Sequence, residues 1–236
     1  MIHIVEETGS TNADLVARLA ADEAVPEGYW LVARQQTAGR GRHGRQWFDG
    51  TGNFMGSTLV RPAPGDPPPP TLALVSGLAA YETVLPLCPD PSAVMLKWPN
   101  DILLGGAKLA GILLEAVRGA VVIGIGVNLR AAPQLADRAT TALADVGSPP
   151  ALEDFAEQLA ASFATELVRW RSHGLELLAR RWQAAAHPLG TPLRVQDPGA
   201  TALTGEFAGL DASGALLLRT ADGKTQAVHA GDVTLD

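Results

Sequence analysis

A short run that alternates glycine with arginine most constrains what this chain can fold into. The run, Gly39-Arg40-Gly41-Arg42-His43-Gly44-Arg45, places three guanidinium groups within six residues and is called the arginine loop below. Like charges this close repel each other and glycine adds backbone freedom, so we do not expect the run to order by itself. An apolar run at 31–33 precedes it and Trp47-Phe48 follows it, which is typical of a loop between packed elements.

The composition of the arginine loop favours an anionic ligand. Arginine binds phosphate and carboxylate groups through paired hydrogen bonds, and glycine amides can approach the same oxygens closely. The sequence therefore predicts a loop that is disordered when empty and closes over a polyphosphate. The alternative is a solvated basic loop or an RNA-binding tail, which the apolar flanks of the run disfavour.

Length and charge limit the classes of protein to consider. With 236 residues, of which 47% are hydrophobic, the chain can form one large domain or a main domain with a small appendage. A formal net charge of -7 argues against broad nucleic-acid binding, which requires an extended positive surface. We therefore expect any anion to be held locally by the arginine loop.

The cysteine count and the N-terminus indicate the compartment. The single cysteine, Cys88, cannot form an internal disulfide and has no histidine nearby in sequence to activate it, so we interpret it as an incidental thiol. Glu6 and Glu7 stand where a signal segment would be basic, and no apolar run approaches the length of a membrane span. The sequence predicts a cytoplasmic protein that does not associate with membranes.

Apolar periodicity and turn residues predict the order of the elements. Helices are expected after Ser10-Thr11-Asn12 as far as Val25-Pro26, over 72–85, and over 151–186 with a break at His173-Gly174. Strands are expected at 2–5, 29–35, 53–60, 94–98, 102–104, 109–116 and 121–129, and then at 193–195, 205–207, 215–218 and 226–228. This order indicates an antiparallel or mixed sheet with helices, followed by a small all-β barrel.

A second polar group surrounds a tight proline turn. The segment Lys97-Trp98-Pro99-Asn100-Asp101 is followed by the apolar strand 108–115, which begins with Lys108 and ends with Glu115. A lysine on a buried strand is costly unless it is paired, so Lys108 can face a ligand. The alternative is a strand-end lysine that reaches solvent, and the pattern alone does not choose between them.

Taken together, the arginine loop, the proline turn, the strand 108–115 and Gly124-Ile125-Gly126-Val127-Asn128 resemble the biotin protein ligases in order and spacing. The resemblance covers most of residues 1–186. It implies an α+β fold like the core of class II aminoacyl-tRNA synthetases, with a mixed sheet and flanking helices in a catalytic domain at 1–187. Residues 188–236 would form a small SH3-like β-barrel. The pattern starts within the first dozen residues, which is expected of the short form without an N-terminal DNA-binding domain.

The resemblance also implies an ATP-dependent biotin ligase reaction, in which biotin and ATP give biotinyl-5'-AMP and an acceptor lysine then takes the biotin. Lys108, Arg40 and Arg42 would be catalytic. Residues matching the biotin site are Ser10, Thr11, Asn12, Gln36, Gly39, Arg40, Gly41, Arg42, Lys108 and Gly111. Those matching the nucleotide site are Arg42, Arg45, Trp47, Asn100 and Asn128. The chain departs from the family's pattern at Gly9, which precedes the biotin turn, and at Thr37.

The implied co-substrates and partners follow from this reaction. ATP would bind with Mg²⁺, for which Asp101 is a candidate ligand, and the chain would carry no prosthetic group. The partner would be a biotin carboxyl carrier protein, and no binding to DNA is expected. The family often forms homodimers, and the sequence does not decide whether this chain does. The rivals are a lipoate or octanoate ligase, which shares the core fold, and a ligand-sensing regulator or RNA-binding module.

Overall fold

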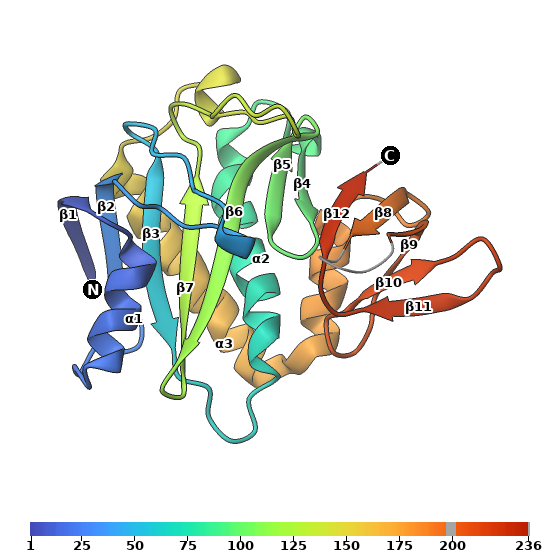
Figure 1. The fold of residues 1–236 in the computed structure, drawn as a ribbon, viewed down its shortest axis with the longest axis horizontal. Coiled ribbons are helices and arrows are strands. Elements are labelled where there is room, and N and C mark those ends of the chain that lie inside the picture. Colours follow the sequence, from blue (N-terminus) through green and yellow to red (C-terminus); the bar gives the residue numbers. More distant parts are fainter. Residues whose placement is uncertain (197–201, 236) are drawn as a thin grey trace.

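The computed structural model describes residues 1–196 and 202–235, which form two β-sheets and three α-helices (Figure 1). The larger sheet contains seven strands in the order β1-β2-β3-β7-β6-β5-β4. Their bounds are β1 Ile2–Thr8, β2 Trp30–Gln36, β3 Phe54–Val60, β4 Val94–Lys97, β5 Asp101–Leu104, β6 Ala107–Val117 and β7 Ala120–Val127. Strands β1 and β2 are parallel and all other neighbours are antiparallel, so the sheet is mixed, as predicted.

Alternation along the strands gives the large sheet two different faces. On β7, Val121, Ile123, Ile125 and Val127 belong to the main hydrophobic core. Ala120 and Val122 belong to a smaller core on the opposite face. Because side chains of a strand point alternately to the two faces, Gly124 and Gly126 continue the second face beyond the smaller core. That face is therefore open over the two glycines.

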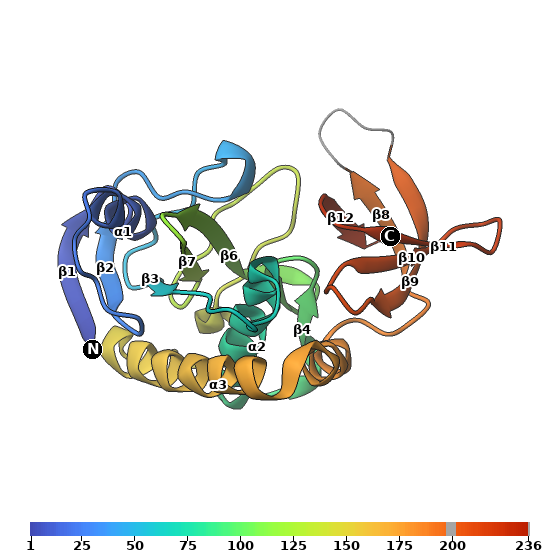
Figure 2. The same ribbon diagram turned by 90° about the horizontal axis from the view of Figure 1, so that it is seen from below.

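Three helices cover the sheet. Helix α1 (Thr11–Ala20) packs on the face of the smaller core, whereas α2 (Leu72–Val84) and α3 (Leu152–Ala185) pack together on the other face. Figure 2 shows α3 running beneath the large sheet from the β1 side toward the C-terminal strands. The N-terminus of α1 lies at the edge of the open region, where its first residues can contact a ligand.

Helix α1 starts as predicted but ends earlier than expected. The hydroxyl of Ser10 caps it by accepting a hydrogen bond from the amide of Ala13 at 3.4 Å. The helix stops at Ala20, not at Val25-Pro26, because Asp22 adopts a left-handed backbone conformation with φ of 59°. Such a conformation cannot continue a right-handed helix.

One helical segment within the described residues, Pro69–Leu87, is long and apolar enough by composition to cross a membrane. This differs from the prediction that no apolar run approaches the length of a membrane span. Most of this segment is buried inside the protein, and α2 at its centre packs against α3 and the sheet. Its apolar composition is that of a core helix.

Helix α3 buries one apolar face and confirms the predicted break. Phe155, Phe163 and Trp170 are buried, and Gly174 leaves the helical region with φ of 69°. Glycine adopts this conformation without the steric cost that a side chain would add. The kink directs the last turns of α3 toward the C-terminal strands.

The C-terminal strands form a separate five-stranded antiparallel sheet in the order β11-β10-β9-β8-β12. Its strands are β8 Pro192–Gln196, β9 Leu203–Leu210, β10 Leu216–Arg219, β11 Thr225–Val228 and β12 Asp232–Leu235. The first four were predicted, and β12 was missed because only two alternating apolar residues mark it. The predicted class, an α+β fold with a mixed sheet and a small C-terminal β-structure, is confirmed.

Candidate active site

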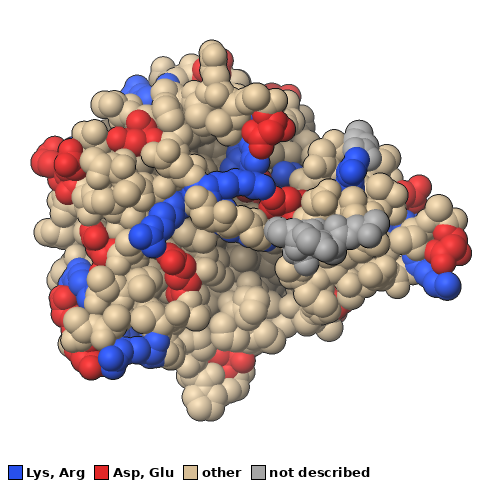
Figure 3. Space-filling view, viewed as in Figure 1, with Lys and Arg blue, Asp and Glu red and all other residues tan. Residues whose placement is uncertain are grey.

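A cavity of about 950 Å³ lies on the open face of the large sheet and extends to the C-terminal sheet. Figure 3 shows Lys and Arg atoms crossing a hollow in this region. Six Lys or Arg residues and four Asp residues among the described ones line the cavity, an excess of positive charge in a chain of net charge -7. They are Arg40, Arg42, Arg45, Lys97, Lys108, Arg138, Asp49, Asp101, Asp137 and Asp232.

The turn at the start of α1 forms one end of the cavity. The backbone amide of Thr11 donates to Oε1 of Gln36 at 2.8 Å, and the Thr11 hydroxyl lies 2.7 Å from that of Ser57. The side-chain amide of Asn12 donates to Glu115. These contacts tie the helix to β2, β3 and β6, so its first polar side chains are held rigidly. Ser10, Thr11, Asn12 and Gln36 are all buried and line the cavity, as expected of a site for a small polar group.

The indole of Trp47 lies on two glycines of the sheet. Gly111 on β6 and Gly126 on β7 are cross-strand partners. A Cβ atom added at Gly126 would lie 2.3 Å from the Trp47 ring, and one at Gly111 would lie 2.9 Å from it. The Lys108 ammonium lies 5.8 Å from the ring centroid, within range of a cation–π interaction. The absence of side chains at both glycines therefore makes room for an aromatic wall beside Lys108.

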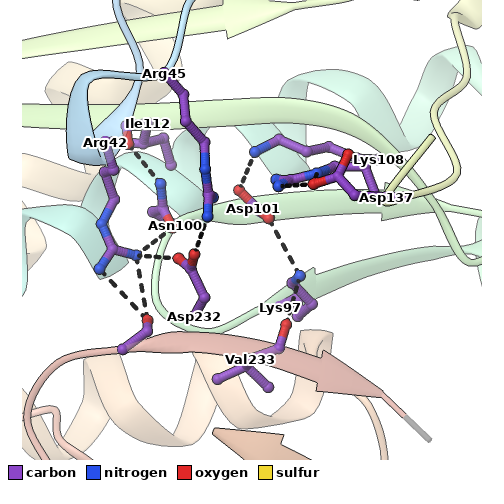
Figure 4. Close-up of polar contacts among 12 residues, drawn as sticks. Arg42, Arg45, Lys97, Asn100, Asp101, Lys108, Ile112, Asp137, Asp232 and Val233 are labelled. Atoms are coloured by element: carbon purple, nitrogen blue, oxygen red, sulfur yellow. Dashed lines mark hydrogen bonds and ion pairs between the residues drawn. The ribbon is translucent and has the colours of Figure 1, made fainter. Parts of the chain in front are cut away.

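Two lysines share one buried carboxylate in the floor of the cavity (Figure 4). Nζ of Lys108 lies 2.5 Å from one oxygen of Asp101, and Nζ of Lys97 lies 3.3 Å from the other. Burial raises the pKa of Asp101, but the two ammonium groups outweigh burial and hold the pKa below its ordinary value. Together, Lys97, Lys108 and Asp101 carry one net positive charge. Lys108 thus faces the cavity, the first of the two alternatives that its sequence pattern left open.

The arginine loop forms a further wall of the cavity and contacts two other segments of the chain. Nη1 of Arg42 donates to Oδ1 of Asn100 at 3.1 Å, and Asn100 itself donates to the carbonyl of Ile112 at 2.8 Å. Arg45 forms an ion pair with Asp232 of β12 (Figure 4). Within the part of the chain that the structure describes, Arg40 lines the cavity without an ion-pair partner.

The structure brings together nearly all of the predicted site residues. The predicted residues that line the cavity are Ser10, Thr11, Asn12, Gln36, Arg40, Gly41, Arg42, Arg45, Trp47, Asn100, Asp101, Lys108, Gly111 and Asn128. Gly39 does not line it. A Cβ atom at Gly39 would lie 3.1 Å from the carbonyl oxygen of Trp47, so this glycine allows the two ends of the loop to approach closely. The roles of the individual residues stay predictions.

Unpartnered buried polar atoms indicate where a ligand binds. Among the described residues, Oδ1 of Asn12, Nε1 of Trp47 and Oδ1 of Asn128 are buried without a hydrogen-bond partner, and all three residues line the cavity. Most buried polar atoms in proteins have a partner, because leaving one unsatisfied is costly. One donor and two acceptors in the same cavity are therefore suited to a polar ligand that completes these bonds.

Sequence reasoning missed two walls of the cavity. The segment 133–140 returns to Lys108, whose backbone amide donates to the carbonyl of Ala139 at 2.9 Å, and this pairing brings Arg138 into the cavity wall. The residues of β12 form the other missed wall. Neither wall carries a local sequence signal, since each reaches the site only through tertiary pairing.

The described residues include no cluster of three or more His, Cys, Asp or Glu side chains that could hold a metal ion. Mg²⁺ bound with a nucleotide requires only one or two carboxylates and otherwise takes phosphate oxygens and water. Both oxygens of Asp101 already contact ammonium groups, which weighs against its predicted role as a magnesium ligand. Mg²⁺ is therefore regarded as part of the nucleotide substrate.

Comparison with known proteins agrees with this geometry. Residues 8–130 match the sequence model of the biotin/lipoate A/B protein ligase family, and residues 189–236 match that of the biotin protein ligase C terminal domain. The chain belongs to the biotin/lipoate A/B protein ligase family. The first matched segment includes the arginine loop, the proline turn and the Lys108 strand, and the second includes β12.

Known proteins of similar sequence or structure match this chain over nearly its whole length. It is 40% identical to the biotin–acetyl-CoA-carboxylase ligase of Mycobacterium tuberculosis, over 98% of this chain and 88% of that one. It is 36% identical to the enzyme of the same name from Paracoccus denitrificans, over 98% of each. The biotin protein ligase from Aquifex aeolicus in complex with biotin and ATP superimposes with a TM-score of 0.86 at 26% identity, over 100% of this chain and 98% of that one.

Proposed function

We propose that this chain is a biotin protein ligase that activates biotin with ATP to biotinyl-5'-AMP and transfers biotin to a lysine of a carrier protein. The observation that carries the proposal is the convergence, in one cavity, of the arginine loop, Lys108 and the polar turn of α1. Two relatives that match this chain over nearly its whole length, both biotin–acetyl-CoA-carboxylase ligases, support the same reaction.

In the first step the biotin carboxylate attacks the α-phosphorus of ATP, the bond to the β-phosphate oxygen breaks, and pyrophosphate leaves. Both reactants are anionic, so cations must reduce their repulsion and stabilise the charge that develops on the phosphate. Lys108 lies in the cavity floor, where it and Arg40 would contact the carboxylate, while Arg42 and Arg45 would contact the phosphates. Mg²⁺ would neutralise further phosphate charge. The hydroxyls of the α1 turn would bind the ureido head of biotin.

In the second step the lysine amine of the acceptor attacks the carbonyl of the mixed anhydride, and AMP leaves. The anhydride is already activated, so the protein mainly positions the amine and excludes water. The arginine loop covers the cavity and suits both tasks. Closure of a loop over a reactive intermediate is a common way to slow its hydrolysis.

Further parts of the proposal concern the setting of this reaction. The acceptor would be the biotin carboxyl carrier protein of acetyl-CoA carboxylase or a related biotin-dependent enzyme, and the reaction would take place in the cytoplasm. We also propose the division into residues 1–187 as the catalytic domain and 188–236 as a small barrel domain.

The test is biotin-dependent exchange of labelled pyrophosphate into ATP, followed by transfer of labelled biotin to a carrier domain. Biotin should support the exchange and unlabelled biotin should compete in the transfer assay, whereas lipoate should do neither. Competition by lipoate or octanoate alone would identify the lipoate-ligase rival. Binding of biotin without exchange or transfer would identify a ligand-sensing regulator. The Lys108→Ala variant is the matched control, and it should bind biotin while losing exchange.

A further inference from the structure

The contact between the arginine loop and the C-terminal sheet involves the same guanidinium groups that the proposed function assigns to the phosphates of ATP. Arg45 is paired with the carboxylate of Asp232, and Nη1 of Arg42 lies 3.9 Å from it. Nε2 of His43 also lies 3.9 Å from this carboxylate. Asp232 is thus surrounded by basic side chains of the loop, and it lines the cavity itself.

The backbone carbonyl of Gly231, next to Asp232, makes a second contact with the arginine loop. Nη1 and Nη2 of Arg42 lie 3.5 Å and 3.4 Å from the carbonyl oxygen of Gly231. Gly231 has φ of 140°, a backbone region that glycine adopts readily and other residues rarely do. The turn into β12 therefore presents a carbonyl and a carboxylate side by side to the loop.

From this geometry we infer that Asp232 is a positioning residue, which holds Arg45 and Arg42 in the absence of nucleotide and is displaced when phosphates take the arginines. The inference rests on the proposed function, because it takes ATP as the anion that competes. We call the pairing of Asp232 with these arginines the latch.

The exposure of the latch determines how strongly it can compete. The side chains of Arg45 and Asp232 are 48% and 35% exposed, so solvent screens their attraction. Ion pairs this exposed shift an equilibrium by no more than about fivefold. A triphosphate carries about four negative charges against one on Asp232 and can bind both arginines bidentately. The latch therefore shifts the empty loop, which the sequence predicts to be disordered, only several-fold toward the paired form, and it is weak enough to be exchanged for ATP.

The latch also gives the C-terminal sheet a role between the two steps of the proposed reaction. Pyrophosphate leaves after the first step and takes most of the phosphate charge with it. The arginines that held that charge are then available to Asp232 again. Re-pairing would hold the loop against β12 while the adenylate waits for its acceptor.

Two measurements on the full chain test the latch. Trypsin cleaves after Arg40 and Arg42, so the Asp232→Asn variant without nucleotide should lose loop protection and be cleaved several-fold faster than the wild type. Calorimetry with a non-hydrolysable ATP analogue should show about two- to fivefold tighter binding for this variant, because no carboxylate competes. Adenosine has no phosphate and should bind both proteins equally.

Controls separate the latch from general effects of charge or folding. Asp222→Asn makes the same charge change in the C-terminal sheet at a residue that pairs with Lys224 away from the cavity, and it should change neither measurement. Arg45→Gln breaks the latch from the other side, and adding Asp232→Asn to it should cause little further gain in cleavage.

Unchanged cleavage together with equal or weaker binding of the analogue by Asp232→Asn would overturn the inference. An equal gain for adenosine would also overturn it, since that result indicates a reshaped cavity. If the wild-type chain binds no ATP analogue at all, the proposed function is wrong, while the cleavage measurement still decides whether the latch exists.

Discussion

The contact between Trp47 and Gly126 makes Gly126→Ala the most crowded glycine substitution in the cavity. The added methyl group would lie 2.3 Å from the indole, where ordinary contacts begin at 3.4 Å, so the ring must move by about 1.1 Å. The ring cannot move toward the sheet, because it already lies against the backbone of β6 and β7 at Gly111 and Gly126. The aromatic wall beside Lys108 must therefore shift outward into the space of the substrate.

A displacement of about 1 Å in a positioning group can lower a rate about 100-fold. We therefore expect kcat/KM for biotin-dependent pyrophosphate exchange to fall by about two orders of magnitude in Gly126→Ala. Stability should fall by no more than about 1–3 kcal/mol, the usual cost of one extra methyl group in a packed site. Circular dichroism during thermal unfolding would measure this change in stability.

The control is Gly147→Ala, because a Cβ atom there would meet only the carbonyl of Leu87, at an ordinary 3.8 Å. It should keep full activity. Combining Gly126→Ala with Trp47→Leu should recover the lost stability, since the smaller side chain removes the clash. Near-normal exchange by a folded Gly126→Ala protein would refute the assignment of Trp47 as a wall of the substrate site.

Three further substitutions test the charged groups of the cavity. Lys108→Ala should lower adenylate formation at least 100-fold while the protein stays folded, because Asp101 keeps Lys97 as a partner; normal pyrophosphate release would contradict this. The pKa of Asp101 is lower in the folded state, so its charge stabilises the fold above the unfolded value of 3.8, and this contribution is lost as the pH falls through the folded pKa. In denaturant titrations the stability advantage of the wild type over Asp101→Asn should shrink below that pH, and a constant difference would refute it. Arg138→Gln should raise the KM for ATP about fivefold with little change in the KM for biotin, whereas Arg130→Gln, outside the cavity wall, should change neither.

The sequence predicted most strands because their apolar runs are short and bounded by glycine or proline turns. It missed β12, where Asp232 and Thr234 alternate with Val233 and Leu235 in a strand too short for periodicity to identify. The end of α1 was also placed wrongly, since the left-handed conformation of Asp22 carries no strong local signal.

The lining of the cavity was predicted best where its residues are contiguous in sequence. The arginine loop and the proline turn each gather several polar side chains within a few residues. By contrast, Arg138 reaches the cavity because a distant segment pairs with the backbone of Lys108, and Asp232 reaches it because the C-terminal sheet packs beside the loop. Contacts of this kind depend on tertiary structure, which periodicity and composition do not encode.

A structure of the protein with biotin and a non-hydrolysable ATP analogue tests the central claim most directly. We predict that the biotin carboxylate will contact Lys108, that the phosphates will contact Arg42 and Arg45, and that the ureido head will lie at Ser10 and Thr11. Ligands bound elsewhere, with the guanidinium groups of the loop directed into solvent, would contradict the account.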